Sequence, residues 1–194
     1  MPTARPVPVV TATPSVAGTA SPVDSSSPGA SASATDVPLP LPHADATLEA
    51  KLPAELGGLP MVSYSVQLPL YMASTTGGDT VLYTPWLVSL GKTADQVTMA
   101  VATDPTRTEN VIVEAFEVPG VQDAKMISAF GDAAIGKGWP VAQKSVGGKT
   151  CLEIQDPNPT GALSVGYAYA KGGILYVVVT DDPAVLIEAY IKLP

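Results

Sequence analysis

The chain has few side chains that could perform acid, base or nucleophilic chemistry. It contains one histidine, His43, and one cysteine, Cys151. His43 lies in a Pro-, Ser- and Ala-rich stretch that we predict to be disordered, where no scaffold would hold the imidazole within hydrogen-bond reach of a nucleophile. We therefore expect no serine–histidine or cysteine–histidine machinery. A zinc site needs three or four nitrogen or sulfur ligands, so we also predict no metal and no cofactor.

Cys151 lies in the segment KTCLEIQ, where it alternates with Glu153 and Gln155 opposite two apolar residues. This pattern predicts a small, half-buried strand residue. A redox or lipidated role is the alternative, and Lys149 is the nearest cation that could lower the thiol pKa.

The acidic residues are numerous but scattered. Glu114 and Glu117 stand three apart in one predicted strand, so they point to opposite faces and cannot act as a pair there. The acids are therefore interpreted as solvated groups or helix caps. A hydrolase using acidic residues remains an alternative, and it would need two carboxylates that converge in a cleft.

The aromatic residues are the best candidates for ligand binding. Tyr167 and Tyr169 share one face of a predicted strand, together with Leu163 and Val165. Tyr64 and Trp139 lie in strands predicted nearby. If these side chains are open to solvent, they form a platform for a protein, peptide or glycan partner. Otherwise they belong to the core beneath the helices.

Charge argues against nucleic acid as a partner. The chain has 10 basic and 18 acidic residues, a net charge of −8, and no block of Lys or Arg. The electrostatic footprint of a nucleic-acid-binding protein is missing. No apolar run approaches the roughly 20 residues of a membrane-spanning helix, so no transmembrane segment is expected.

Residues 1–44 are rich in Pro, Ser, Thr and Ala and contain no aromatic residue. Such a segment buries too little apolar area to offset the entropy of ordering, so we predict a disordered, semi-stiff spacer. It resembles the spacer that follows the lipidated cysteine of many exported bacterial lipoproteins. This resemblance implies an extracellular or cell-surface location. A membrane tether would require a lipobox cysteine upstream of Met1, and a cytoplasmic location is the alternative.

Residues 45–194 are predicted to form one α+β domain. A brief helix after Asp45 should end at the Gly57–Gly58 turn. Hydrophobic periodicity then predicts three further helices and seven strands. The helices span 79–92, 121–138 and 183–193. The strands span 61–68, 96–104, 110–118, 139–146, 149–155, 162–170 and 174–180.

The order strand, turn, strand, helix occurs twice, at 96–135 and at 161–194. This repetition suggests two pseudo-symmetric, ββα-containing halves, 58–136 and 137–194, although chance similarity of ordinary ββα units explains it equally well. We expect one antiparallel sheet of about six or seven strands with the helices on one face. The expected function is that of a non-catalytic binding or interaction module. A structural subunit that pairs through a sheet edge is a further alternative.

Overall fold

A computed structural model describes residues 41–74, 80–106, 111–157 and 165–194. The predicted spacer therefore lies outside the described residues, apart from its last four positions. Leu163 also lies outside them, as do Asp79 and the side chain of Thr80 at the start of the helix predicted at 79–92.

The described elements are five α-helices, one short 3-10 helix and nine strands. The helices are α1 (Ala46–Glu49), α2 (Leu68–Ser74), α3 (Thr80–Leu90), α4 (Asp123–Gly136) and α5 (Pro183–Lys192), with η1 at Ala94–Gln96. The strands are β1 (Glu55–Leu56), β2 (Leu59–Pro60), β3 (Val62–Gln67), β4 (Thr98–Thr103), β5 (Ile112–Glu117), β6 (Val141–Val146), β7 (Lys149–Gln155), β8 (Val165–Lys171) and β9 (Ile174–Val179).

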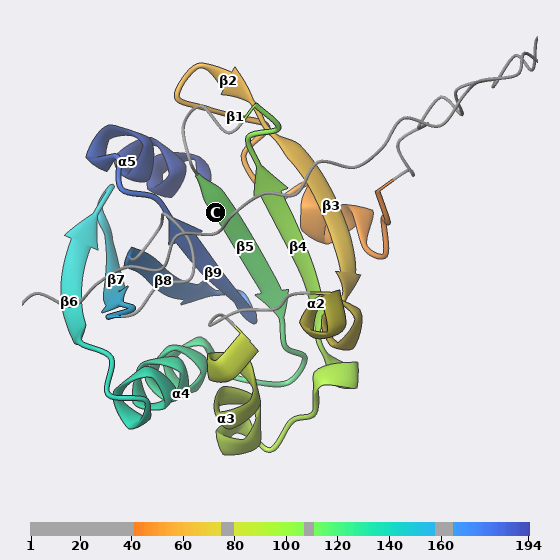
Figure 1. Cartoon of the computed structure of the whole chain (residues 1–194), viewed down its shortest axis with the longest axis vertical. Helices are drawn as coiled ribbons and strands as arrows, with labels where there is room; N and C mark the ends of the chain where they lie inside the picture. Colours follow the sequence, from red (N-terminus) through yellow and green to blue (C-terminus); the bar gives the residue numbers. More distant parts are fainter. Residues whose placement is uncertain (1–40, 75–79, 107–110, 158–164) are drawn as a thin grey trace, which may run out of the picture. The chain divides into compact units, whose positions relative to one another are not determined.

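The main sheet has seven antiparallel strands in the order β3-β4-β5-β9-β8-β7-β6 (Figure 1). β5 and β9 pair at its centre, with Ala115 opposite Tyr176. The sequence prediction of an α+β fold with an antiparallel sheet of about six or seven strands is confirmed. β1 and β2 form a separate two-stranded hairpin closed by Gly57 and Gly58.

Two tight Gly-Gly turns fix the register of the C-terminal strands. Gly147 and Gly148 join β6 to β7, and Gly172 and Gly173 join β8 to β9, all with φ between 56° and 80°. Both central residues of such two-residue turns need positive φ, which glycine adopts without steric cost.

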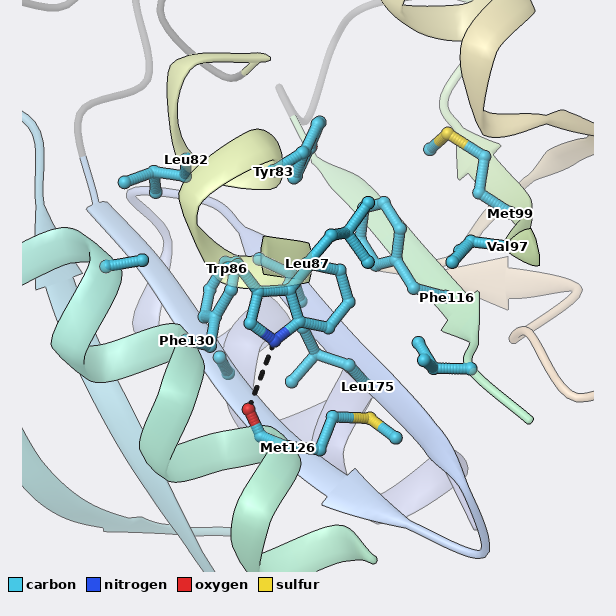
Figure 2. Packing of buried hydrophobic residues seen from close by; sticks show 14 of the residues in the cluster. Leu82, Tyr83, Trp86, Leu87, Val97, Met99, Phe116, Met126, Phe130 and Leu175 are labelled. Carbon is cyan, nitrogen blue, oxygen red and sulfur yellow. Dashed lines mark hydrogen bonds between the residues drawn. The ribbon is translucent and has the colours of Figure 1, made fainter. Parts of the chain in front are cut away.

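One face of the sheet packs against α2, α3 and α4, and we call it the Trp86 face. Trp86 is fully buried and its indole Nε1 donates a hydrogen bond to Met126 O at 3.2 Å, which joins α3 to α4 (Figure 2). Its ring meets those of Phe116 and Phe130 edge-on, with centroids 5.7 and 5.5 Å away. Such edge-to-face pairs add to the apolar burial that holds these helices on the sheet.

The opposite face packs against α1, α5 and the β1-β2 hairpin, and we call it the Tyr190 face. Tyr190 of α5 is fully buried against Tyr169 of β8, and Tyr169 stacks on Tyr176 of β9 with centroids 5.1 Å apart. Asp182 caps α5 by accepting hydrogen bonds from Ala184 N and Val185 N. Pro183 follows as the first residue of the helix, and an Asp N-cap before a Pro is a preferred pairing at this end of a helix.

The expectation that the helices share one face is wrong. The core residues of α3 and α4 pack with Phe116 and Leu175, whereas those of α5 pack with Ala115 and Tyr176. Successive strand residues point to opposite faces, so β5 and β9 place buried apolar residues on both sides of the sheet, and each side needs a cover.

The same finding rules out a twofold pseudo-symmetry between the halves that would place both helices on one face. The strand order is compatible with it, because β4-β5 lies beside β9-β8. Neighbouring antiparallel strands are exchanged only by a twofold axis perpendicular to the sheet, and that rotation keeps each face on its own side. α4 and α5 lie on opposite faces, so no such axis relates the two ββα units.

The chain is ordered slightly before the predicted domain boundary at residue 45. Ser65 N donates to Pro42 O at 3.1 Å, and Ala44 N donates to Ser65 O at 3.0 Å. These bonds hold residues 42–44 against the outer edge of β3. In the part of the chain that the structure describes, no helix is long and apolar enough to cross a membrane.

Candidate functional site

The four aromatic residues predicted to bind a ligand do not come together. Tyr167 and Tyr169 lie on the Tyr190 face, whereas Tyr64 and Trp139 pack against the core of the Trp86 face. A single platform made of all four is therefore not formed.

Tyr169 is part of the core, as the alternative interpretation stated. Its side chain is 5 % exposed, and its hydroxyl donates to Pro194 O at 2.8 Å. Burial raises its pKa above the usual range. Tyr167 is half-buried beside Glu153, its neighbour on β7. Burial and the hydrogen bond to this carboxylate raise the pKa of Tyr167 to about 12. These two tyrosines do not form an open aromatic surface, because α5 covers Tyr169.

Tyr64 instead lies near a group of polar side chains on the Trp86 face that we call the Glu114 cluster: Glu114, Tyr64, Tyr71 and Tyr83. Glu114 lies on the central strand β5 and is 5 % exposed. Tyr71 of α2 donates to one carboxylate oxygen at 3.0 Å, and Tyr83 of α3 donates to the other at 3.2 Å. Two helices thereby orient one carboxylate above the sheet.

The register of the sheet explains why Tyr64 joins this cluster. Tyr64 is opposite Val101, and Val101 is opposite Glu114, so all three lie in one row across β3, β4 and β5. Burial raises the pKa of Tyr64, and the negative charge of Glu114 raises it further. The Tyr64 phenol is protonated at neutral pH, as an ordinary tyrosine is, and can donate a hydrogen bond.

Next to the Glu114 cluster, the Trp86 face is less deeply covered. One row of directly paired residues crosses five strands there, and we call it the open row: Val62, Thr103, Ile112, Val179 and Gly166. Val62 is 37 % exposed, and the other four are half-buried. Neighbouring strands lie about 4.8 Å apart, so the row is about 20 Å long. It combines apolar side chains with a buried acid at its border.

Gly166 adds to this surface a position that lacks a side chain. A Cβ atom there would make ordinary contacts with Val177 Cγ1 at 3.7 Å and Val179 Cγ2 at 3.9 Å. Neither steric crowding nor a positive φ therefore requires glycine at this point of β8. Glycine inside a strand marks, among other features, a site where a ligand approaches the backbone closely.

Two other candidate groups do not form reactive sites. Glu49 accepts from Ser65 Oγ at 2.5 Å and lies 2.9 Å from His43 Nδ1. The carboxylate thus separates the hydroxyl from the imidazole, which is the wrong order for nucleophile activation. Cys151 lies on a strand as predicted but is fully buried instead of half-buried, and burial raises the pKa of its thiol, so the reactive thiolate is disfavoured.

Sequence reasoning missed Glu114 because it treated the acids as solvated groups. The prediction that Glu114 and Glu117 face opposite sides of the sheet is confirmed, since Glu114 pairs with Val177 and Glu117 with Ile174. A usable signal was that Glu114 takes an inward position between Ile112 and Phe116. Among the described residues, no group of three or more His, Cys, Asp or Glu could hold a metal ion.

Comparison of the chain with protein-family models, with curated proteins and with solved structures finds no match.

Proposed function

We propose that the chain is an exported or surface-tethered binding module without catalytic activity, and that its ligand binds over the Glu114 cluster and the open row. One observation carries this proposal: a nearly buried carboxylate, held by hydroxyls from two helices, borders a half-exposed apolar strand surface. The composition of residues 1–44 supports the export part of the proposal.

The chemistry of this surface favours a peptide or protein segment that carries a cationic side chain. Ile112 and Val179 offer apolar contact to the body of such a segment, and Tyr64 offers an aromatic ring and a hydroxyl donor. Glu114 supplies negative charge, and the chain as a whole carries −8. Complementary charge accelerates encounter and selects between partners.

Titration of the isotope-labelled chain with a peptide panel tests the binding site. The probes are short apolar peptides with Lys or Arg at one position, each matched to a copy with Gln there. We expect the basic peptides to shift the amide NMR signals of Tyr64, Ile112, Glu114 and Gly166 more strongly than their neutral copies do. A panel of soluble oligosaccharides tests the alternative of a glycan ligand.

A matched pair of glycine substitutions provides the control. Gly166→Ala should preserve the fold and weaken binding at least tenfold, because its methyl group occupies the ligand-facing side of the open row. Gly136→Ala lies at the end of α4, where an added Cβ meets nothing within 4 Å, and should bind like the wild type. Shifts confined to the Tyr190 face, or equal binding by both variants, would contradict the proposed site.

Protease treatment of intact cells tests the proposed location. A surface-tethered chain should be cleaved while the cells remain intact, and a chain protected until lysis would refute the surface tether.

A further inference from the structure

The two edge strands of the main sheet, β3 and β6, differ in the hydrogen bonds on their outer sides (Figure 1). At the β3 edge, the outward N–H and C=O of Ser65 bond to Pro42 and Ala44. At the β6 edge, no described residue bonds to the outer side of the strand, and residues 142–145 are all exposed. An unpaired strand edge is a ready template for another strand.

The hydrogen-bond pattern shows which groups of β6 point outward. Gln155 N donates to Pro140 O at 3.0 Å, and the register places these two residues opposite each other. Antiparallel pairs alternate between bonded and non-bonded positions. The residues at 142, 144 and 146 therefore bond to β7, whereas Val141, Gln143 and Ser145 direct their N–H and C=O groups away from the sheet.

We propose that β6 pairs with β6 of a second copy of this chain, antiparallel, about a twofold axis at Gln143. The outward groups of one copy then meet those of the other. Gln143 lies opposite its own copy, Val141 lies opposite Ser145, and Ala142 lies opposite Lys144. The two sheets become one continuous sheet, and no like charges stand directly opposite each other.

Charge complementarity supports this register. Lys144 Nζ lies 3.6 Å from Glu153 within one chain, and Ala142 is the direct neighbour of Glu153 on the same face. In the pair, Lys144 of the second copy lies opposite Ala142. The single methyl group of Ala142 lets the lysine chain cross it toward Glu153, and the twofold axis repeats this contact. A lysine on an edge strand often prevents pairing, but here the register supplies an acid partner.

Apolar residues flank the edge. α5 lies against the turn at one end of β6, since a Cβ on Gly147 would come within 3.3 Å of Ile187 O and Ile191 N. Ile187 and Ile191 are 47 % and 66 % exposed. In the proposed pair this end of β6 adjoins the second copy. An edge contact of this size lies at the low end of specific interfaces, so we expect a dissociation constant in the micromolar range, roughly 1–100 µM.

Sedimentation equilibrium of the full chain, with a charge-reversal pair, tests the proposal. In a dimer of Lys144→Glu, the new carboxylate of each copy faces Glu153 of the other copy. In a dimer of Glu153→Lys, the new ammonium of each copy faces Lys144 of the other. Each variant should sediment as a monomer at concentrations where the wild type is dimeric. An equal mixture should restore the dimer, because each contact then joins opposite charges. Within each single chain the 144–153 pair remains like-charged, so intrachain effects cannot produce this rescue.

A backbone variant tests the same edge independently of charge. Gln143→Pro removes an outward N–H while leaving the bonds to β7, and it should weaken association at least tenfold with an unchanged circular dichroism spectrum. A wild-type chain that is monomeric throughout the millimolar range would overturn the proposal. Dimers that persist in both charge variants and in Gln143→Pro would overturn it as well.

Discussion

Glu114 accepts hydrogen bonds from tyrosines of two different helices, so its carboxylate ties both α2 and α3 to the sheet. Glu114→Ala removes an acceptor shared by the hydroxyls of buried Tyr83 and half-buried Tyr71, and hydrogen bonds to charged groups contribute about 1.5–3 kcal/mol each. We expect the free energy of unfolding to fall by about 2–4 kcal/mol in urea titrations. Glu117→Ala on the same strand serves as control, with an expected loss below about 0.5 kcal/mol. Equal losses in the two variants would show that Glu114 does not hold the helices.

Two core tyrosines, Tyr169 and Tyr190, differ in the hydrogen-bond partners of their hydroxyls. Tyr190 Oη is fully buried, and among the described residues its neighbour for hydrogen bonding is the Cys151 thiol, which is only a weak donor and acceptor, whereas the Tyr169 hydroxyl donates to Pro194 O. Burying a hydroxyl without a strong hydrogen-bond partner costs about 1–3 kcal/mol. Tyr190→Phe should therefore raise the free energy of unfolding by about 1 kcal/mol, and Tyr169→Phe should lower it by about 1 kcal/mol. Thermal unfolding measures both, and a destabilised Tyr190→Phe would mean that the contact of this hydroxyl with the Cys151 thiol stabilises the fold.

At the residue scale, alternation in the strands was enough to predict that Tyr167 and Tyr169 share a face, and it placed Cys151 on a strand but only half-buried. It could not show that α5 covers Tyr169, because that depends on which side of the sheet the helix crosses. It also could not bring Tyr71, Tyr83 and Glu114 together, since these contacts span 43 and 31 residues along the chain.

At the element scale, local signals were strongest where capping and periodicity agree. α5 has both, with Asp182 at its N-cap and Leu186, Ala189 and Tyr190 buried. α2 was missed because the predicted strand 61–68 runs up to Pro69, and a proline is expected to end a strand or lie at its edge. In the structure Pro69 is the second residue of the helix, a position where the missing N–H of proline costs nothing.

The cap of α5 can be tested against its neighbour. Asp182 accepts hydrogen bonds from two backbone N–H groups at 2.7 and 3.2 Å, whereas Asp181 is exposed and does not cap the helix. Asp182→Ala should lower the free energy of unfolding by about 1 kcal/mol, the usual loss on removing an N-cap side chain. Asp181→Ala should change it by less than about 0.5 kcal/mol. Chemical unfolding distinguishes the two, and equal effects would indicate a general charge effect instead of capping.

At the scale of the whole molecule, the sequence carried one signal for a sheet covered on both sides. The run ILYVVV in β9 has no polar face, and five of its six residues are buried. That pattern requires helices on both faces, which is why the two ββα units differ although their element order is the same. Which helix takes which face depends on the chain paths after β5 and β9, and local periodicity does not report those paths.

The buried tyrosines make a prediction about the stability of the whole fold at high pH. Burial raises the pKa of Tyr167 and of Tyr176 to about 12, and it raises those of Tyr169 and Tyr190 as well. In the unfolded chain these phenols ionise near pH 10. The folded state then binds more protons than the unfolded state above that pH, so their contribution to stability is complete below about pH 10 and is lost toward pH 12.

Two further groups on the Tyr190 face modify this profile. Burial raises the pKa of the Cys151 thiol, so its contribution is lost in the same direction, beginning near pH 9. Burial lowers the pKa of Lys149, whose ammonium donates to Tyr190 O and Leu193 O. The contribution of Lys149 to the stability of the fold therefore rises as pH approaches 10.5.

A single lysine cannot offset four tyrosines, so we expect the urea midpoint of unfolding to fall steadily above about pH 10. Phenolate absorbance should report these tyrosines only as the chain unfolds. Their titration near pH 10 with an unchanged circular dichroism spectrum would mean that water reaches the Tyr190 face in the folded protein.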